Sequence, residues 1–459
     1  MRVSKLLTPD LKTTLEEEPE QLQDALSEVH PEDIAAVLVD ELPPEQAAEV
    51  VKRLPLEQAA EVLERLPEEL RISILAHFKP ETSADLLSEM APDDRADLVN
   101  ELPASLRESI LSELQKYEPE VAEETRVLAS YGEDTAGGIM TTEFLSRGPG
   151  MSCQKAIEEV RRMAQEQNPE QIYSLYVLDA GRLVGVLSLR DLILGEPSAS
   201  IAMYVTDNVV KVSPETDQEE VARTFAKYDL TAVPVVDHAG QMLGVVTIDD
   251  VVDVVIEEAS EDAQKMAGVV PVDKSYLDIT FLTFVRSRVT WLVVLFFGEL
   301  LTANVMRHYE SEIAALIDLV IFVPLIISSG GNSGSQSSSL IIRALALGQI
   351  APGDWIKVFW RELRVGITLG ILLSLVGFAR TILLGESAQP LVMGIVVGTS
   401  LIAVVTLGTL VGSLMPLLIK RLGLDPAVSS TPFVASLVDV FGLAVYFTVS
   451  RLVLNFMAA

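Results

Sequence analysis

A chain of 459 residues is too long for one ordinary domain, and about 150 residues per domain suggests roughly three. Of its 34 basic and 66 acidic residues, 11 and 10 lie between Leu277 and Ala459, so the first 276 residues carry a net charge of −33. So acidic a region predicts cations as partners and no nucleic acid. The single cysteine, Cys153, excludes internal disulfides and cysteine-based zinc cages.

The first part of the chain contains a short proline repeat. Seven prolines recur about every 12 residues, at Pro31, Pro43, Pro55, Pro67, Pro80, Pro92 and Pro103. A proline followed by acidic residues is typical of a helix start. We therefore predict a stack of short helices, an α-solenoid, over residues 1–130. The first 30 residues have no signal-peptide core, so we expect the amino terminus to stay in the cytoplasm.

A second, longer repeat follows. The segment Asp179–Leu192 recurs 59 residues on as His238–Val251. Each copy predicts the order helix, strand, tight turn, strand, helix, and ends in the pattern Gly-h-h-Ser/Thr-x-x-Asp, where h is apolar. The predicted helices are Ala156–Met163 and Gln218–Tyr228, and the predicted first strands are Tyr173–Leu178 and Ala232–Val236.

This repeat resembles a tandem pair of α/β CBS domains, which we place at residues 131–258. In that family the hydroxyl and carboxylate of the final pattern often hold the phosphate and ribose of a nucleotide. The resemblance therefore implies a weak site for an adenine nucleotide such as ATP. Its residues would be Ser188, Arg190 and Asp191 in the first copy, and Thr247 with Asp250 in the second.

An acidic stripe leads from this repeat toward the apolar half of the chain. Asp250, Asp253, Glu257 and Glu261 share one face of a helix that continues into a linking region at residues 259–280. Like charges so placed repel one another. The stripe is either a solvated face or a surface that a cation neutralises.

Five apolar stretches approach or exceed the ~20 residues that cross a bilayer. They are Val289–Val305, Ile313–Ile327, Val365–Leu384, Leu391–Ile419 and Phe433–Met457. We predict five membrane helices over residues 281–459, in contact with lipid. With the amino terminus inside, eight basic residues lie on cytoplasmic segments and three on the other side, which places the carboxyl terminus outside.

A Gly/Ser-rich run, Ser328–Ser339, follows the second stretch. One interpretation is a flexible linker. The other is irregular polar backbone that lines a watery cavity, the only setting in which such backbone is tolerated at membrane depth.

Two carboxylates stand out in the apolar half. Asp439 lies inside the fifth stretch, where a charge is costly unless it faces water or a cation. The alternative is a protonated residue that packs through hydrogen bonds. Asp425 precedes Pro426 and is expected to cap a helix. Oxygen ligands favour a hard cation such as Mg²⁺.

The order of these parts resembles the MgtE family of magnesium channels over nearly the whole chain. The most specific motifs are Asp134–Met140, Gly330–Gln336 and the segment from Leu424 to Val440. The resemblance implies a homodimer in the cell inner membrane, with a pore on the two-fold axis between the second and fifth spans. It also implies that Mg²⁺ is both the transported ion and the ligand that closes the channel.

The resemblance also assigns site residues. Asp439 would be the pore carboxylate, Ala435 a carbonyl ligand beside it and Asp425 a ligand at the cytoplasmic mouth, and Asn332 and Gln336 would line the pore. The regulatory Mg²⁺ ligands would be Glu61, Asp93, Asp97, Gly138 (through its carbonyl), Asp217, Glu219, Ala226 (carbonyl), Asp229, Asp250, Asp253, Glu258, Glu261 and Asp262.

Two alternatives remain open at this point. One is a broader divalent-cation transporter for Mn²⁺, Co²⁺ or Ni²⁺, and the other is a CBS-regulated membrane scaffold that transports nothing. We expect no enzyme, because a membrane metalloprotease needs a His-Glu-x-x-His site and the apolar half has only His308. An anion channel is disfavoured because Asp439 and an acidic vestibule would repel anions.

Overall fold

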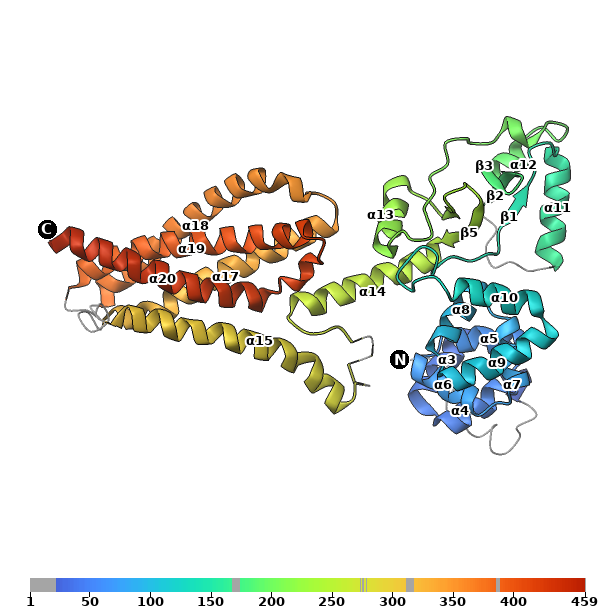
Figure 1. The fold of residues 1–459 in the computed structure, drawn as a ribbon, viewed down its shortest axis with the longest axis horizontal. Coiled ribbons are helices and arrows are strands. Elements are labelled where there is room, and N and C mark those ends of the chain that lie inside the picture. Colours follow the sequence, from blue (N-terminus) through green and yellow to red (C-terminus); the bar gives the residue numbers. More distant parts are fainter. Residues whose placement is uncertain are drawn as a thin grey trace. The chain divides into compact units, whose positions relative to one another are not determined.

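The computed structural model describes residues 22–166, 174–272, 274, 276–277, 279–310, 318–384 and 389–458. The chain divides into two compact units, Met1–Val255 and Ile256–Ala459. Figure 1 follows their elements along the sequence.

The first unit opens with short helices that begin at or beside the repeated prolines. They are α2 (Leu22–Leu26), α3 (Pro31–Glu41), α4 (Pro44–Val51), α5 (Leu56–Glu64), α6 (Glu68–Ala76), α7 (Pro80–Ser88), α8 (Pro92–Glu101), α9 (Ala104–Tyr117) and α10 (Pro119–Leu128). Most pack against the second helix along the chain, as α3 does on α5 and α4 on α6. Leucine, valine and alanine side chains fill the core between them. The predicted repeat of short helices is confirmed.

The CBS repeat has the predicted element order. The first copy contains β1 (Leu145–Arg147), α11 (Cys153–Glu166), β2 (Ser174–Asp179), β3 (Arg182–Ser188) and α12 (Leu189–Leu194), and η2 (Ile201–Met203) follows it. The second contains α13 (Gln218–Tyr228), β4 (Ala232–Val236), β5 (Met242–Thr247) and α14 (Ile248–Met266). β1 is parallel to β2, and β2–β3 and β4–β5 are antiparallel pairs. Tyr173, the predicted start of β2, lies outside the described residues.

The repeated pattern requires a glycine for the same structural reason in both copies. A Cβ added at Gly185 would lie 2.9 Å from the carbonyl oxygen of Thr206, and one added at Gly244 would lie 2.6 Å from that of Thr141. At each place a neighbouring segment pairs with the strand through backbone hydrogen bonds. The segment that enters one copy thus pairs with the strand of the other, which joins the two copies.

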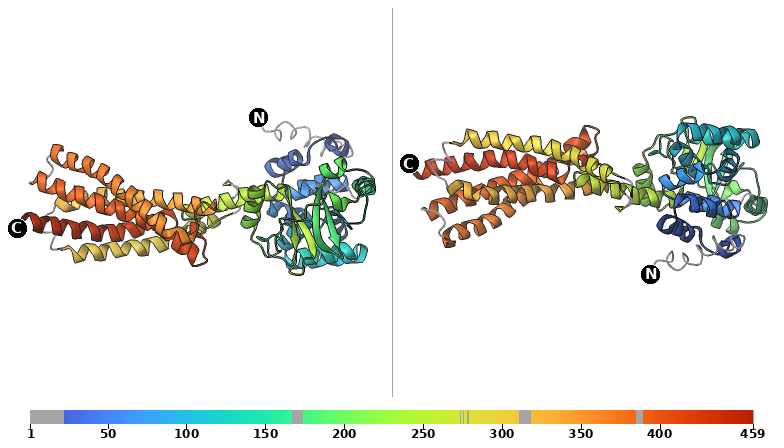
Figure 2. Two further views of the ribbon diagram at one scale, coloured as in Figure 1. Left: turned by 90° about the horizontal axis from the view of Figure 1, so that it is seen from above. Right: turned by 90° about the horizontal axis from the view of Figure 1, so that it is seen from below.

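The second unit contains long helices. They are α15 (Phe281–His308), α17 (Asp318–Ala346), α18 (Trp355–Leu384), α19 (Pro390–Arg421) and α20 (Thr431–Ala458), with short turns η3 (Pro352–Asp354) and η4 (Pro426–Val428). The views in Figure 2 show these helices running side by side. Among the described residues, four segments are long and apolar enough to span a membrane: α15, Pro352–Leu384, α19 and α20. Five such spans were predicted, and four are found among the described residues. Residues 313–317, where the second predicted stretch begins, lie outside the described residues.

The prediction for the Gly/Ser-rich run is wrong in both its forms. Ser328–Ser339 is neither a linker nor irregular backbone but the middle of helix α17. Its glycines let α17 approach α19 closely: a Cβ added at Gly408 would lie 2.3 Å from the carbonyl oxygen of Gly330, and one added at Gly412 would lie 2.0 Å from that of Gly334. Small residues are what close helix packing requires. The run is therefore rich in glycine and serine because this part of α17 packs closely against α19.

Candidate metal sites

An acidic pocket lies within the first unit where the first turns of α8 and α14 meet. Both helices begin with acidic residues, Asp93 and Asp94 in α8 and Asp249 and Asp250 in α14. A helix amino terminus favours such charges one by one, but here two sets face each other. The pocket has a volume of about 320 Å³ and is lined by Glu32, Glu64, Arg65, Ala91, Asp93, Asp94, Thr141, Glu143, Thr247, Asp249, Asp250 and Asp253.

Burial and mutual repulsion make these carboxylates hard to ionise. Asp93 is 9% exposed, and its buried Oδ1 has no hydrogen-bond partner among the described residues. Burial, followed by repulsion from Asp250 and Asp94, raises the pKa of Asp93 well above its usual range. Burial also raises the pKa of Asp250 to about 7, although a hydrogen bond from Thr247 opposes the rise. A cation in the pocket would relieve both effects.

Asp97 shows the same strain one turn further along α8. Burial, and then the charges of Asp94 and Glu101, raise the pKa of Asp97 to about 7. The acidic pocket itself brings together three of the predicted regulatory ligands, Asp93, Asp250 and Asp253. The other acids that line this pocket were not predicted from the sequence, although acidic residues in the first turns of two helices were an available signal.

Other predicted ligands serve local structure. Asp217 caps α13 by accepting a hydrogen bond from the backbone amide of Glu219, at 2.9 Å. Glu219 also forms an ion pair with Arg223. Asp229 ends α13 in a left-handed conformation, with φ of 52°. Of the remaining predicted ligands, Ala226 lies on α13, Glu61 on α5, Gly138 in the loop before β1, and Glu258, Glu261 and Asp262 on α14. In the described parts of the chain, no three His, Cys, Asp or Glu side chains are close enough together to hold a metal ion.

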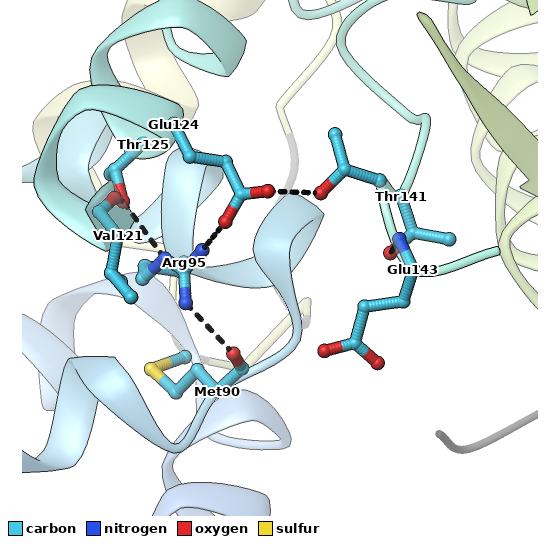
Figure 3. Close-up of polar contacts among 8 residues, drawn as sticks. Met90, Arg95, Val121, Glu124, Thr125, Thr141 and Glu143 are labelled. Atoms are coloured by element: carbon cyan, nitrogen blue, oxygen red, sulfur yellow. Dashed lines mark hydrogen bonds and ion pairs between the residues drawn. The ribbon is translucent and has the colours of Figure 1, made fainter. Parts of the chain in front are cut away.

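A polar network holds the helices beside the pocket to the CBS pair (Figure 3). Arg95 is 3% exposed and donates hydrogen bonds to the Thr125 hydroxyl, the Met90 carbonyl and the Glu124 carboxylate. The second oxygen of Glu124 accepts a hydrogen bond of 2.6 Å from the hydroxyl of Thr142, in the loop that leads into β1. This network contains no metal ligand predicted from the sequence.

The paired pattern of the CBS repeat has one geometry in both copies. The Ser188 hydroxyl donates to Asp191 Oδ2 at 2.7 Å, and the Thr247 hydroxyl donates to Asp250 Oδ2 at 2.6 Å. The predicted hydroxyl and carboxylate therefore lie together at the start of the helix that follows each strand. Arg190 is exposed beside the first pair.

In the second unit, Asp439 of α20 faces the glycine side of α17. A Cβ added at Gly331 would lie 3.7 Å from Asp439 Oδ1 and 3.8 Å from the Cβ of Ala435. Asn332 and Gln336, one turn apart on α17, are exposed within this single chain. The carboxyl group of Glu299, on α15, lies beside that of Asp439. Glu299 was missed because it stands alone in an apolar stretch and belongs to no motif.

Asp425 connects two elements of this unit. Its Oδ1 accepts a hydrogen bond of 2.8 Å from the backbone amide of Ala427, the expected cap, and its Oδ2 pairs with Lys265 of α14 at 2.7 Å. Burial opposes the charge of Lys265, but hydrogen bonds to Asp425 and Glu261 outweigh burial and raise the pKa of the ammonium group.

Comparison with known proteins agrees with this architecture. Three family models match: the MgtE intracellular N domain over residues 29–134, the CBS domain over 136–195 and 201–257, and the MgtE divalent cation transporter over 323–449. The magnesium transporter MgtE of Thermus thermophilus is 43% identical over 342 residues, and that of Enterococcus faecalis is 35% identical over 338 residues. These alignments cover 74% and 73% of each chain.

Two solved structures resemble the first part of the chain. The soluble part of a magnesium transporter is 33% identical, with a TM-score of 0.51, and the match covers 56% of this chain and 99% of that one. The cytosolic domain of the Mg²⁺ channel MgtE, solved in complex with ATP, is 38% identical, with a TM-score of 0.47, and the match covers 54% of this chain and 99% of that one.

The fold and its sites define a class of protein in which a CBS pair is joined to apolar helices long enough to span a membrane. The family models that match the two ends of the chain are both MgtE models, and the second is described as a divalent cation transporter. The chain belongs to the MgtE family of magnesium transporters.

The raised pKa values predict how the metal-free first unit responds to pH. An aspartate whose folded pKa is raised from about 4 to about 7 stabilises the fold at low pH, and this contribution is lost as the pH rises through 7. We expect a fragment of residues 1–276, without divalent cations, to melt at a lower temperature at pH 8 than at pH 6. The variant Asp97→Asn/Asp250→Asn should show a smaller difference, and an equal difference in parent and variant would contradict this account.

Proposed function

We propose that this chain is a Mg²⁺-selective channel of the cell inner membrane that works as a homodimer. The pore assignment rests on the position of Asp439, a half-buried carboxylate opposite the glycine side of α17. Asn332 and Gln336 leave polar groups uncovered on α17 of one chain. A second copy that faces them would complete a polar path, in which paired Asp439 carboxylates hold a largely hydrated Mg²⁺.

In this proposal α17 is the second of five spans, although it is less apolar than the others. Its glycines Gly330 and Gly334 are buried against α19, and Gly331 lies opposite Asp439 of α20, so little of this side needs to meet lipid. Five spans and a cytoplasmic amino terminus place the carboxyl terminus outside. Ala435, one turn before Asp439, would offer its carbonyl to the hydrated ion, and Asp425 would bind the ion at the cytoplasmic mouth.

Regulation by Mg²⁺ rests on the acidic pocket of the first unit. Mg²⁺ binds through one or two carboxylates and keeps several waters, so the pair Asp93 and Asp250 can hold it without a third acidic ligand. Closure follows if Mg²⁺ binds the closed state better than the open one. The other acids assigned by the family resemblance, Glu258, Glu261 and Asp262 among them, would add weak sites along α14.

The two alternative functions predict different transport behaviour. A broader divalent transporter would use the same oxygen ligands, and only competition between Mg²⁺ and Mn²⁺, Co²⁺ or Ni²⁺ in flux measurements separates it. A non-transporting scaffold would give no flux at all.

The pore assignment predicts that Asp439→Ala abolishes Mg²⁺ uptake by liposomes that contain the purified protein. Asp439→Asn should do the same, because it keeps the volume and removes the charge. The control is Asp354→Asn, an acidic residue paired with Lys357 in the turn before α18. Normal uptake by a folded Asp439→Ala dimer would overturn the assignment.

The regulatory assignment predicts that Asp93→Asn/Asp250→Asn weakens inhibition by internal Mg²⁺. We expect the half-inhibitory concentration to rise about tenfold, the effect of a loss of about 1.4 kcal/mol of binding free energy. The matched control, Glu81→Gln/Asp85→Asn, removes the same charge from exposed positions on α7. If both double variants shift the inhibition curve equally, net charge and not the pocket is responsible.

We also propose that the CBS pair binds an adenine nucleotide such as ATP. The support is the identical hydroxyl–carboxylate geometry of Ser188–Asp191 and Thr247–Asp250. Calorimetry with ATP on residues 1–276, with and without Mg²⁺, should give a binding heat that Ser188→Ala/Asp191→Ala or Thr247→Ala reduces. An absence of heat under both conditions would remove this proposal.

A further inference from the structure

The end of α14 contacts the turn that precedes α20 through a basic side chain. The ammonium group of Lys265 lies 2.7 Å from Asp425 Oδ2 and 2.8 Å from Glu261 Oε1. The Lys265 side chain is 23% exposed and that of Asp425 is 35% exposed, so water screens this ion pair only in part. Both carboxylates are acids that the family resemblance assigns to Mg²⁺.

Further contacts fix the same end of the helix. The hydroxyl of Thr431, the first residue of α20, donates a hydrogen bond of 2.6 Å to the carbonyl of Met266. Gly268, at a φ of 73°, lies so close to α20 that an added Cβ would be 3.4 Å from Pro432 Cγ and from Ser430 Oγ. A positive φ lets the chain turn immediately after the helix. The ion pair is therefore part of a defined docking contact.

The two oxygens of Asp425 have separate partners. Oδ1 accepts the hydrogen bond that caps the turn at Pro426, and Oδ2 binds the lysine. A divalent cation at the mouth would need the oxygen that Lys265 holds. A lysine ammonium is a compact charge on a flexible stem, so it can leave and return without moving the backbone far.

We propose that Lys265 is a tethered cation that competes with Mg²⁺ for Asp425. While the lysine is bound, it neutralises the mouth carboxylate and holds the end of α14 against α20 without any metal. An ion that enters the mouth must displace it. This inference rests on the proposed channel function, and it adds a residue that stabilises the closed mouth independently of the acidic pocket.

The flux test uses the full-length protein in liposomes. Lys265→Met should raise the internal Mg²⁺ concentration needed for half inhibition by about threefold to tenfold, the effect expected when a partly screened ion pair of the closed state is lost. Lys265→Arg keeps the charge and should resemble the parent. The matched control is Lys357→Met, which removes another lysine–aspartate pair with the same 2.7 Å separation. A parent-like inhibition curve for Lys265→Met would overturn the proposal.

Hydrogen exchange tests the docking contact without relying on transport. The amides of Ala267, Gly268 and Val269 donate to carbonyls at the end of α14. In metal-free protein, Lys265→Met should speed their exchange and Lys357→Met should not. The charge swap Lys265→Asp/Asp425→Lys should restore protection but not transport. If no variant, including the parent, carries Mg²⁺, the proposed function fails; if exchange is unchanged in Lys265→Met, the tether fails while the pore stands.

Discussion

Carboxylates that lose water and face one another repel, and this repulsion is concentrated where α8 meets α14. Asp93 and Asp250 sit in the first turns of those helices, within one pocket. Two unit charges 4 Å apart repel by about 4 kcal/mol at an effective dielectric of 20. The metal-free pocket therefore strains the junction of the short helices with the CBS pair, and a proton or a cation relieves it. Beside the pocket, the Arg95–Glu124–Thr142 network joins the same two parts without a cation.

The second unit also contains carboxylates that lose water, Asp425 and Asp439, and it accommodates each of them differently. Asp425 is balanced by an internal cation, Lys265, whereas Asp439 faces the glycine side of α17. The close approach of α17 to α19, through Gly330, Gly334, Gly408 and Gly412, gives that side its shape. Under our proposals, the acidic pocket responds to internal Mg²⁺ while the lysine tether holds the mouth without it. The acidic helix α14 contributes residues to both.

How far the sequence predicts this structure differs between its parts. The proline repeat and the CBS repeat predicted their elements well, because a helix start and a tight turn are set by local chemistry, and α13 and β4 have the predicted bounds. The Gly/Ser run around Gly330 was misjudged because its glycines serve packing against α19, a partner about 80 residues away in sequence. Lys265 and Glu299 were missed for a related reason: their roles depend on Asp425 and Asp439, which only the fold brings near. The metal ligands that the resemblance assigns stay predictions.

The measurement that most directly tests the central claim is Mg²⁺ uptake by liposomes that contain the purified parent protein, at a series of internal Mg²⁺ concentrations. The account predicts uptake that is fast without internal Mg²⁺ and falls cooperatively as internal Mg²⁺ reaches the millimolar range, with a midpoint that rises with ionic strength. Uptake that is absent, or that does not change with internal Mg²⁺, would contradict it.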